Sequence, residues 1–342
     1  MSKKSSSSFS WGTALRAAVT AAILTWFAMK LNWKELGSQF VQADWRWLLA
    51  ACCLLGGALL CIAARWQTLL KIQAITLSFK PVVALTFIGQ FFNIFLPGSV
   101  GGDVIKIFYI LKYAPHRKAR AALSIVMDRF FGICVLLTLA AATLPWQLRL
   151  MEQNQEMRAV MWTLVGTLAA LAAFILLLAA LPFHRSPPAL RALWHRVPKR
   201  EILESLVAGF RQHGKSPRLT LIALGYCLAV HLLGFSMSYC LARGLHLHAS
   251  FFQMMVILAI VYMLMALPIS INGHGVREFG AAQMFALYGL ISVNPVTGAG
   301  QEPAVVFGLL LFGVNLVWGL VGGVVYLTFQ HHEKAVAHHA SA

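Results

Sequence analysis

Two basic side chains occur in matching surroundings in the two halves of the sequence. Residues 96–106 and 267–278 both open on Leu-Pro; in both, a glycine follows five residues after the proline and a basic residue nine after it. The basic residues are Lys106 and Arg277. A cation beside a glycine-rich turn, where backbone N–H groups are free to donate, suits a phosphate group. The pattern therefore predicts that both side chains contact an anionic headgroup.

Small and polar residues around these two cations are further candidates for substrate binding. They are Asn93, Ser99, Gly101 and Gly102 in the first stretch, and Ser270, Asn272, Gly273 and Gly275 in the second. Pro97 and Pro268 each remove a backbone donor, and the glycines relax the chain, so each apolar run is expected to break into two half-helices. Broken helices at matching places in two halves of a membrane protein indicate a transport site.

Three acids lie within apolar runs, where an ionised group needs a partner. They are Asp103, Asp128 and Glu278, and their expected partners are Lys106, Arg129 and Arg277. Asp103 and Lys106 are three residues apart, so a helix places them on one face. Adjacent Arg277 and Glu278 diverge, so one of them is expected to face the other hairpin.

Two readings of these charges stay open. Either they take part in headgroup binding and gating, or they only neutralise one another and satisfy broken-helix backbone. For Asp128 and Arg129 the sequence favours structural pairing near the cytoplasmic interface. Arg65-Trp66 is interpreted as an interfacial anchor rather than as part of a site.

Composition identifies the protein class. The chain has 342 residues, of which 59% are hydrophobic and 11% charged, whereas soluble domains carry about 25% charged residues. An all-α polytopic membrane protein is predicted. The net charge of +17 comes from loops between apolar runs, which favours anionic lipid rather than nucleic acid as the partner. Six cysteines without CxxC spacing predict neither metal nor disulfides, and no cofactor is expected.

Apolar runs predict six full spans and two re-entrant hairpins, or eight spans if each hairpin is two full helices. The spans are about 12–30, 46–64, 121–144, 159–181, 218–242 and 303–329, and the hairpins are 81–111 and 251–290. Together they form one transmembrane domain, 12–329, between cytoplasmic tails at 1–11 and 330–342. The polar segment 183–217 is expected to hold an amphipathic interfacial helix at about 200–212.

Loop charges predict the topology, because basic loops stay in the cytoplasm. The basic loops are 65–80, 112–120 and 183–217, and the neutral loops are 31–45, 145–158, 243–250 and 291–302. This assignment places both termini in the cytoplasm of a bacterial cell whose inner membrane the chain crosses. It also makes the second repeat, about 159–329, inverted relative to the first, about 12–144, so that the hairpins enter from opposite sides.

Two stretches, NIFLPGSVGGDVIKIF (93–108) and LPISINGHGVREFG (267–280), resemble the lysylphosphatidylglycerol synthase transmembrane-region family of flippase-like membrane proteins. Arg65-Trp66 before Leu69-Leu70, and Asp128-Arg129 before Gly132, are similar to it too. The resemblance covers roughly 12–329 and implies lipid translocation. In bifunctional members this region flips aminoacylated phosphatidylglycerol made by a fused synthase domain, and other relatives are associated with hopanoids or polyprenyl-linked sugars. No synthase domain follows residue 330, so lysyl transfer is not expected.

The leading functional hypothesis is an inner-membrane translocator for an anionic phospholipid or a polyprenyl-phosphate-linked lipid. It is not expected to be an enzyme, because no recognisable catalytic motif appears. Two alternatives stay open. One is a membrane-embedded transferase acting on lipid-linked sugars. The other is a membrane partner that docks a separate synthase or glycosyltransferase through 183–217. The sequence does not define the oligomeric state.

Overall fold

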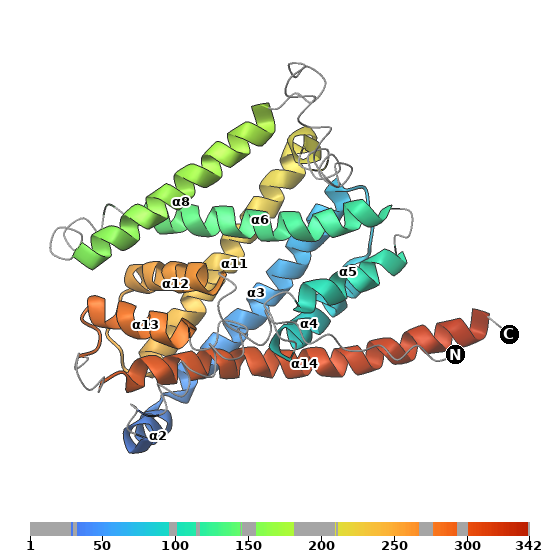
Figure 1. The fold of residues 1–342 in the computed structure, drawn as a ribbon. Coiled ribbons are helices and arrows are strands. Elements are labelled where there is room, and N and C mark those ends of the chain that lie inside the picture. Colours follow the sequence, from blue (N-terminus) through green and yellow to red (C-terminus); the bar gives the residue numbers. More distant parts are fainter. Residues whose placement is uncertain are drawn as a thin grey trace, which may run out of the picture. The chain divides into compact units, whose positions relative to one another are not determined.

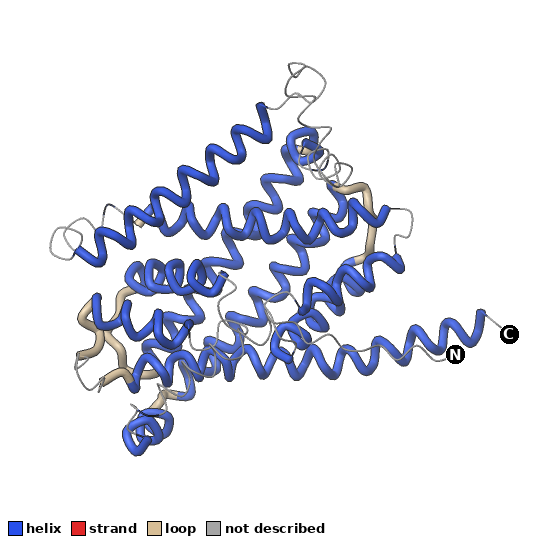
Figure 2. Tube along the Cα trace, in the orientation of Figure 1, coloured by secondary structure: helices blue, strands red, loops and turns tan. Residues whose placement is uncertain are grey.

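The computed structural model consists of helices and their connections, without a strand in the part of the chain it describes (Figures 1 and 2). It describes residues 33–95, 101–113, 117–143, 155–180, 211–266, 276–292 and 300–340, together with residues 29, 145 and 209. Four helices are long and apolar enough to cross a membrane: α3 (Trp45–Ile72), α6 (Lys118–Ala142), α11 (Pro217–Gly244) and α14 (Glu302–Ala340). These helices confirm a polytopic membrane protein, while the number of spans stays a prediction.

Each predicted hairpin contains two short helices. The first consists of α4 (Phe79–Phe95) and α5 (Gly101–Tyr113). The second consists of α12 (Phe251–Ala266) and α13 (Val276–Leu287). The four helices have 17, 13, 16 and 12 residues, and all are shorter than the about 20 residues that a full crossing requires. The Leu-Pro motifs thus fall between separate helices, as the sequence predicts.

Three boundaries differ from the predictions. A helix, α2 (Trp33–Gln42), occupies most of the expected loop 31–45. Helix α3 continues to Ile72 rather than ending near residue 64, because Arg65 is buried and paired instead of marking the membrane surface. Helix α14 likewise continues to Ala340, beyond residue 329. The expected first span, 12–30, and the expected amphipathic helix, 200–212, lie almost wholly outside the described residues.

Helices α3 and α11 have the same length and the same kind of end. Each has 28 residues, and six residues separate each from the next helix. Two residues past the helix end, Ala74 and His246 both adopt a left-handed conformation with φ of 58°. In both turns, backbone N–H groups donate back to carbonyls of the last helical turn, as Ile75 does to Leu70 at 2.9 Å. Both helices therefore stop through the same capping turn.

Two compact units are formed by the chain. Unit 1 is drawn from Met1–Cys53, Gln90–Gly102 and Phe235–Val321, and unit 2 from Leu54–Gly89, Asp103–Gly234 and Gly322–Ala342. Within unit 1, α12 packs on α13, and Phe285 of α13 meets Phe307 of α14 edge to face at 5.2 Å. Within unit 2, α6 packs on α8 (Gln155–Ala180), which matches the predicted span 159–181. A buried apolar cluster there joins α3, α6 and α11.

Candidate functional site

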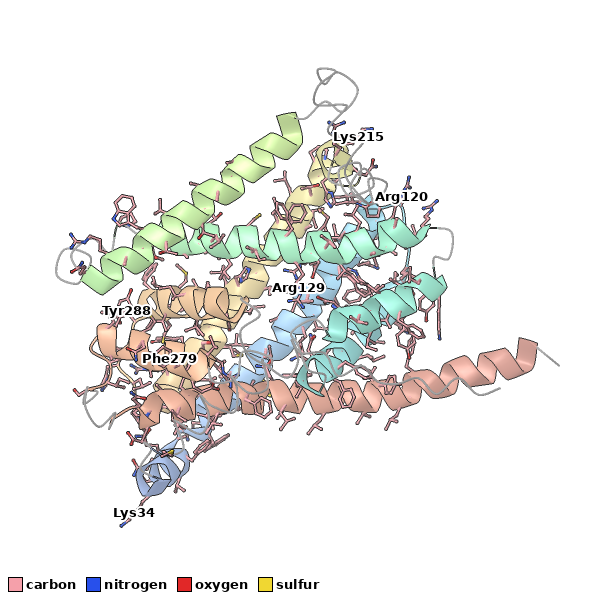
Figure 3. The ribbon with its side chains drawn as sticks, in the orientation of Figure 1. Lys34, Arg120, Arg129, Lys215, Phe279 and Tyr288 are labelled. Atoms are coloured by element: carbon pink, nitrogen blue, oxygen red, sulfur yellow. The ribbon has the colours of Figure 1, made fainter. Side chains whose placement is uncertain are left out.

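Five charged side chains come together in unit 2, on three helices. They are Arg65 on α3, Asp103 and Lys106 on α5, and Asp128 and Arg129 on α6. Arg65, Asp103, Lys106 and Asp128 are buried, whereas the side chain of Arg129 is 53% exposed. Arg129 is labelled in Figure 3. We call this set the charge cluster. It contains three cations and two anions, so it has one positive charge in excess.

The innermost pair of the charge cluster joins Arg65 to Asp128. Nε of Arg65 donates to Oδ1 at 2.6 Å, Nη2 donates to Oδ2 at 2.8 Å, and Nη1 donates to the sulfur of Cys227 at 3.4 Å. The expected pairing of Asp128 with Arg129 was wrong, because Arg65 of α3 binds both carboxylate oxygens of Asp128. The interfacial role expected for Arg65 was also wrong. The signal that was missed is the apolar sequence that continues past it, through Leu69 and Leu70.

Gly132 of α6 lies beside the Arg65 guanidinium. The position that a Cβ of Gly132 would take lies 3.8 Å from Nη1 of Arg65. The carbonyl oxygen of Gly132 lies 2.8 Å from Nε2 of His231 on α11. Helices α3, α6 and α11 thus meet around this guanidinium through polar contacts.

The second pair joins α5 to α6. Nε of Arg129 donates to Oδ2 of Asp103 at 2.7 Å. The expected pair of Asp103 with Lys106 is therefore wrong, although both residues lie on one face of α5. The reason is that the long Arg129 side chain crosses from the neighbouring helix and takes the carboxylate.

Lys106 is the cation of the charge cluster that belongs to neither of these two ion pairs. It is buried, and its Nζ lies 5.0 Å from the centre of the Trp66 ring, a cation–π contact. With respect to the described residues, neither a hydrogen bond nor an ion pair is found for Lys106. Burial works against its charged form, the neighbouring Asp128 and Asp103 favour that form, and Arg129 and Arg65 oppose it. A buried ammonium group in this setting favours an anion as an additional partner.

A hydrogen bond to Asn93 occupies one backbone donor in the first turn of α5. Oδ1 of Asn93 on α4 accepts a hydrogen bond from the backbone N–H of Gly102 at 2.8 Å, and both residues belong to unit 1. Gly101 begins α5 and is buried. The N–H of Gly102, which was expected to be available to a ligand, is therefore bound to Asn93.

In unit 1, Arg277 and Glu278 lie in the first turn of α13, and both are buried. Nε of Arg277 donates to Oε1 of Glu278 at 3.0 Å, and Nη2 donates to the same oxygen. The expected pairing of Glu278 with Arg277 is confirmed. The expected divergence of the two side chains was wrong, because both are long enough to fold toward each other. The Glu278 side chain packs against Gly308 of α14, where it occupies the space that a Cβ would need.

That packing makes a testable prediction about two glycines of α14. A Cβ added at Gly308 would lie 2.8 Å from Cγ of Glu278, whereas one added at Gly313 would meet nothing within 4 Å. We expect Gly308→Ala to lower the free energy of unfolding by about 1–3 kcal/mol through overpacking. Gly313→Ala, the matched control, is expected to raise it by about 0.5–1 kcal/mol. Thermal unfolding in detergent measures both, and equal melting temperatures would contradict the contact.

Seven of the predicted site residues lie outside the described residues: Pro97, Ser99, Pro268, Ser270, Asn272, Gly273 and Gly275. Their roles stay predictions. Lys106 belongs to unit 2 and Arg277 to unit 1, so their contact with one shared headgroup also stays a prediction. Over the described residues, no group of three or more His, Cys, Asp or Glu side chains is placed to hold a metal ion.

Long apolar helices, short paired helices and buried ion pairs define a polytopic α-helical membrane protein. The chain belongs to the family described as the lysylphosphatidylglycerol synthase TM region, whose model matches residues 13–323. A UPF0104 membrane protein of Pyrococcus horikoshii is 32% identical over 95 residues, which is 27% of this chain and 28% of that protein. The matched segment thus spans less than a third of that relative. Family membership confirms the resemblance found in the sequence motifs.

Proposed function

We propose that this protein moves a lipid with an anionic, phosphate-bearing headgroup between the leaflets of a bacterial inner membrane. The observation that carries the proposal is Lys106, a buried ammonium group whose neighbouring acids are both bound by arginines. Membership of a family described by a lipid synthase membrane region supports a lipid as the substrate. The headgroup belongs to an anionic phospholipid or to a polyprenyl-phosphate-linked lipid, which share the phosphate chemistry.

In this proposal the phosphate binds at Nζ of Lys106. Burying a charge without a counter-ion is unfavourable, and a phosphate oxygen at hydrogen-bond distance would offset much of that cost. The Trp66 ring stabilises the ammonium group while no lipid is bound. Arg277, on α13 in unit 1, is a further candidate for phosphate binding. A guanidinium has five N–H donors, and the bonds from Nε and Nη2 to Glu278 leave others for a phosphate oxygen.

Alternating access is the mechanism we propose for this transport. The equal lengths and capping turns of α3 and α11, each followed by two short helices, support an internal repeat. We propose that the two repeats are inverted, with cytoplasmic termini, and that each hairpin opens to its own side.

Transport into reconstituted vesicles tests the proposal. Vesicles of phosphatidylcholine containing fluorescent phosphatidylglycerol are prepared with the purified protein, and dithionite quenching reports how fast inner-leaflet lipid becomes accessible. A fluorescent polyprenyl phosphate in parallel vesicles distinguishes the second lipid source. We expect Lys106→Ala to reduce transport at least about tenfold, the equivalent of roughly 1.4 kcal/mol of lost headgroup binding. Lys112→Ala, which removes an exposed lysine from the same helix, is the matched control and keeps the rate.

Three results would overturn this function. The first is that the wild-type protein transports neither lipid, and the second is that Lys106→Ala transports at the wild-type rate. The third is that mass spectrometry finds the lipid chemically altered rather than moved. The last result would favour the transferase alternative.

A further inference from the structure

We propose that Arg129 is a positioning residue: by holding Asp103 in an ion pair, it prevents this carboxylate from neutralising Lys106. Lys106 thereby keeps a positive charge available to the lipid phosphate. The inference rests on the proposed function, because it explains how the headgroup contact is kept open. It concerns contacts within unit 2.

The first argument comes from spacing on α5. Asp103 and Lys106 are three residues apart in one helix, which ordinarily brings an acid and a base together. Oδ2 of Asp103 instead lies 2.7 Å from Nε of Arg129, and within the described part of the chain Lys106 has no ion pair. The nearest acid in the sequence is therefore kept from the lysine by a residue of another helix.

The second argument is that the other acid near Lys106, Asp128, is also bound by an arginine. Both oxygens of Asp128 accept hydrogen bonds from Arg65. Among the described residues, Asp103 and Asp128 are the two acids that favour the charged form of Lys106, and each has its own arginine. Two arginines thus balance two acids, and the remaining charge of the cluster is concentrated on the lysine.

The third argument is the position of Arg129. Its side chain is 53% exposed, on the same face of α6 as the exposed apolar residues Val126 and Ile133. A cation in the middle of an apolar helix face is costly. Neutralising Asp103 would not require it, since Lys106 is available three residues away. A second cation bound to Asp103 does what Lys106 cannot do itself, because it keeps this carboxylate away from the lysine.

Substitutions that remove the charge of Arg129 or Asp103 test this arrangement in the vesicle assay with fluorescent phosphatidylglycerol. Arg129→Gln should reduce transport about tenfold, because Asp103 then pairs with Lys106 and competes with the phosphate. Adding Asp103→Asn to that variant removes the competitor and should recover most of the rate. The single variant Arg129→Lys, which keeps the charge, should retain most of the wild-type transport rate. A double variant as slow as Arg129→Gln, or Arg129→Gln as fast as wild type, would overturn the inference.

A stability cycle tests the same re-pairing without any lipid transport. In the wild-type background, Lys106→Met removes a lysine that lacks an ion pair with the described residues, so the melting temperature in detergent should stay level or rise. In the Arg129→Gln background, Lys106→Met should lower it by a few degrees, because Asp103 loses its new partner. Equal effects in the two backgrounds would overturn the inference even if Lys106 proves essential for transport. If instead the cycle shows this coupling and wild-type protein moves no lipid, the proposed function fails while the pairing stands.

Discussion

Asp128→Ala is expected to lower the free energy of unfolding by about 3–5 kcal/mol, the usual effect of removing one partner from a buried ion pair. The Arg65 side chain is only 8% exposed, so its guanidinium would lose both carboxylate bonds in apolar surroundings. The sulfur of Cys227, at 3.4 Å, is too weak an acceptor to replace them. Thermal unfolding of the detergent-solubilised protein, followed by tryptophan fluorescence, measures the loss.

A double variant distinguishes two causes of the expected instability, the unpaired charge of Arg65 and the lost side-chain volume at residue 128. Arg65→Met combined with Asp128→Leu removes both charges and keeps apolar bulk, so its stability should approach or exceed that of wild type. If the double variant were as unstable as Asp128→Ala, the ion pair would not be the cause of the instability.

Glu278→Ala is expected to have the second largest effect, also about 3–5 kcal/mol, because it strands Arg277 in the first turn of α13. The side chains of Arg277 and Glu278 are 8% and 6% exposed. The substitution also leaves an unfilled space beside Gly308, which the Glu278 side chain occupies. Chemical denaturation in mixed micelles, monitored by circular dichroism, reports the change.

The matched control for this substitution is Gln283→Ala, which truncates an exposed polar side chain about one and a half turns further along α13. It should change stability by less than about 0.5 kcal/mol, as exposed surface substitutions do. Comparable losses at residues 278 and 283 would show that α13 tolerates neither truncation, and the buried pair would then have no special role.

The helices could be predicted from the sequence because each depends on local information. Apolar runs placed α3, α6, α8, α11 and the apolar part of α14, and the Leu-Pro motifs placed the breaks within the two hairpins. Helix α2 was missed because ten residues of mixed polarity between two apolar runs look like a loop. The extension of α14 to Ala340 was missed because its last turns lack an apolar run.

The pair of adjacent Arg277 and Glu278 was predicted, but the ion pairs of the charge cluster could not be, since their partners lie far apart in the sequence. Asp128 pairs with Arg65, 63 residues away, and Asp103 pairs with Arg129, 26 residues away. Sequence spacing considers only neighbours on one helix, so it assigned Asp103 to Lys106 and Asp128 to Arg129. Those assignments hid the feature that matters most, which is that Lys106 is left without an acid of its own among the described residues.

The charge of residue 106 is the central claim, and a comparison of two substitutions there tests it most directly. Lys106→Arg keeps a cation near Trp66, and Lys106→Gln keeps a similar length without charge. Initial rates of fluorescent phosphatidylglycerol transport are measured in the same vesicles for both. We predict that the arginine variant retains a substantial rate and that the glutamine variant falls at least about tenfold below wild type. Equal rates for the two variants would show that the positive charge at residue 106 does not bind the lipid phosphate.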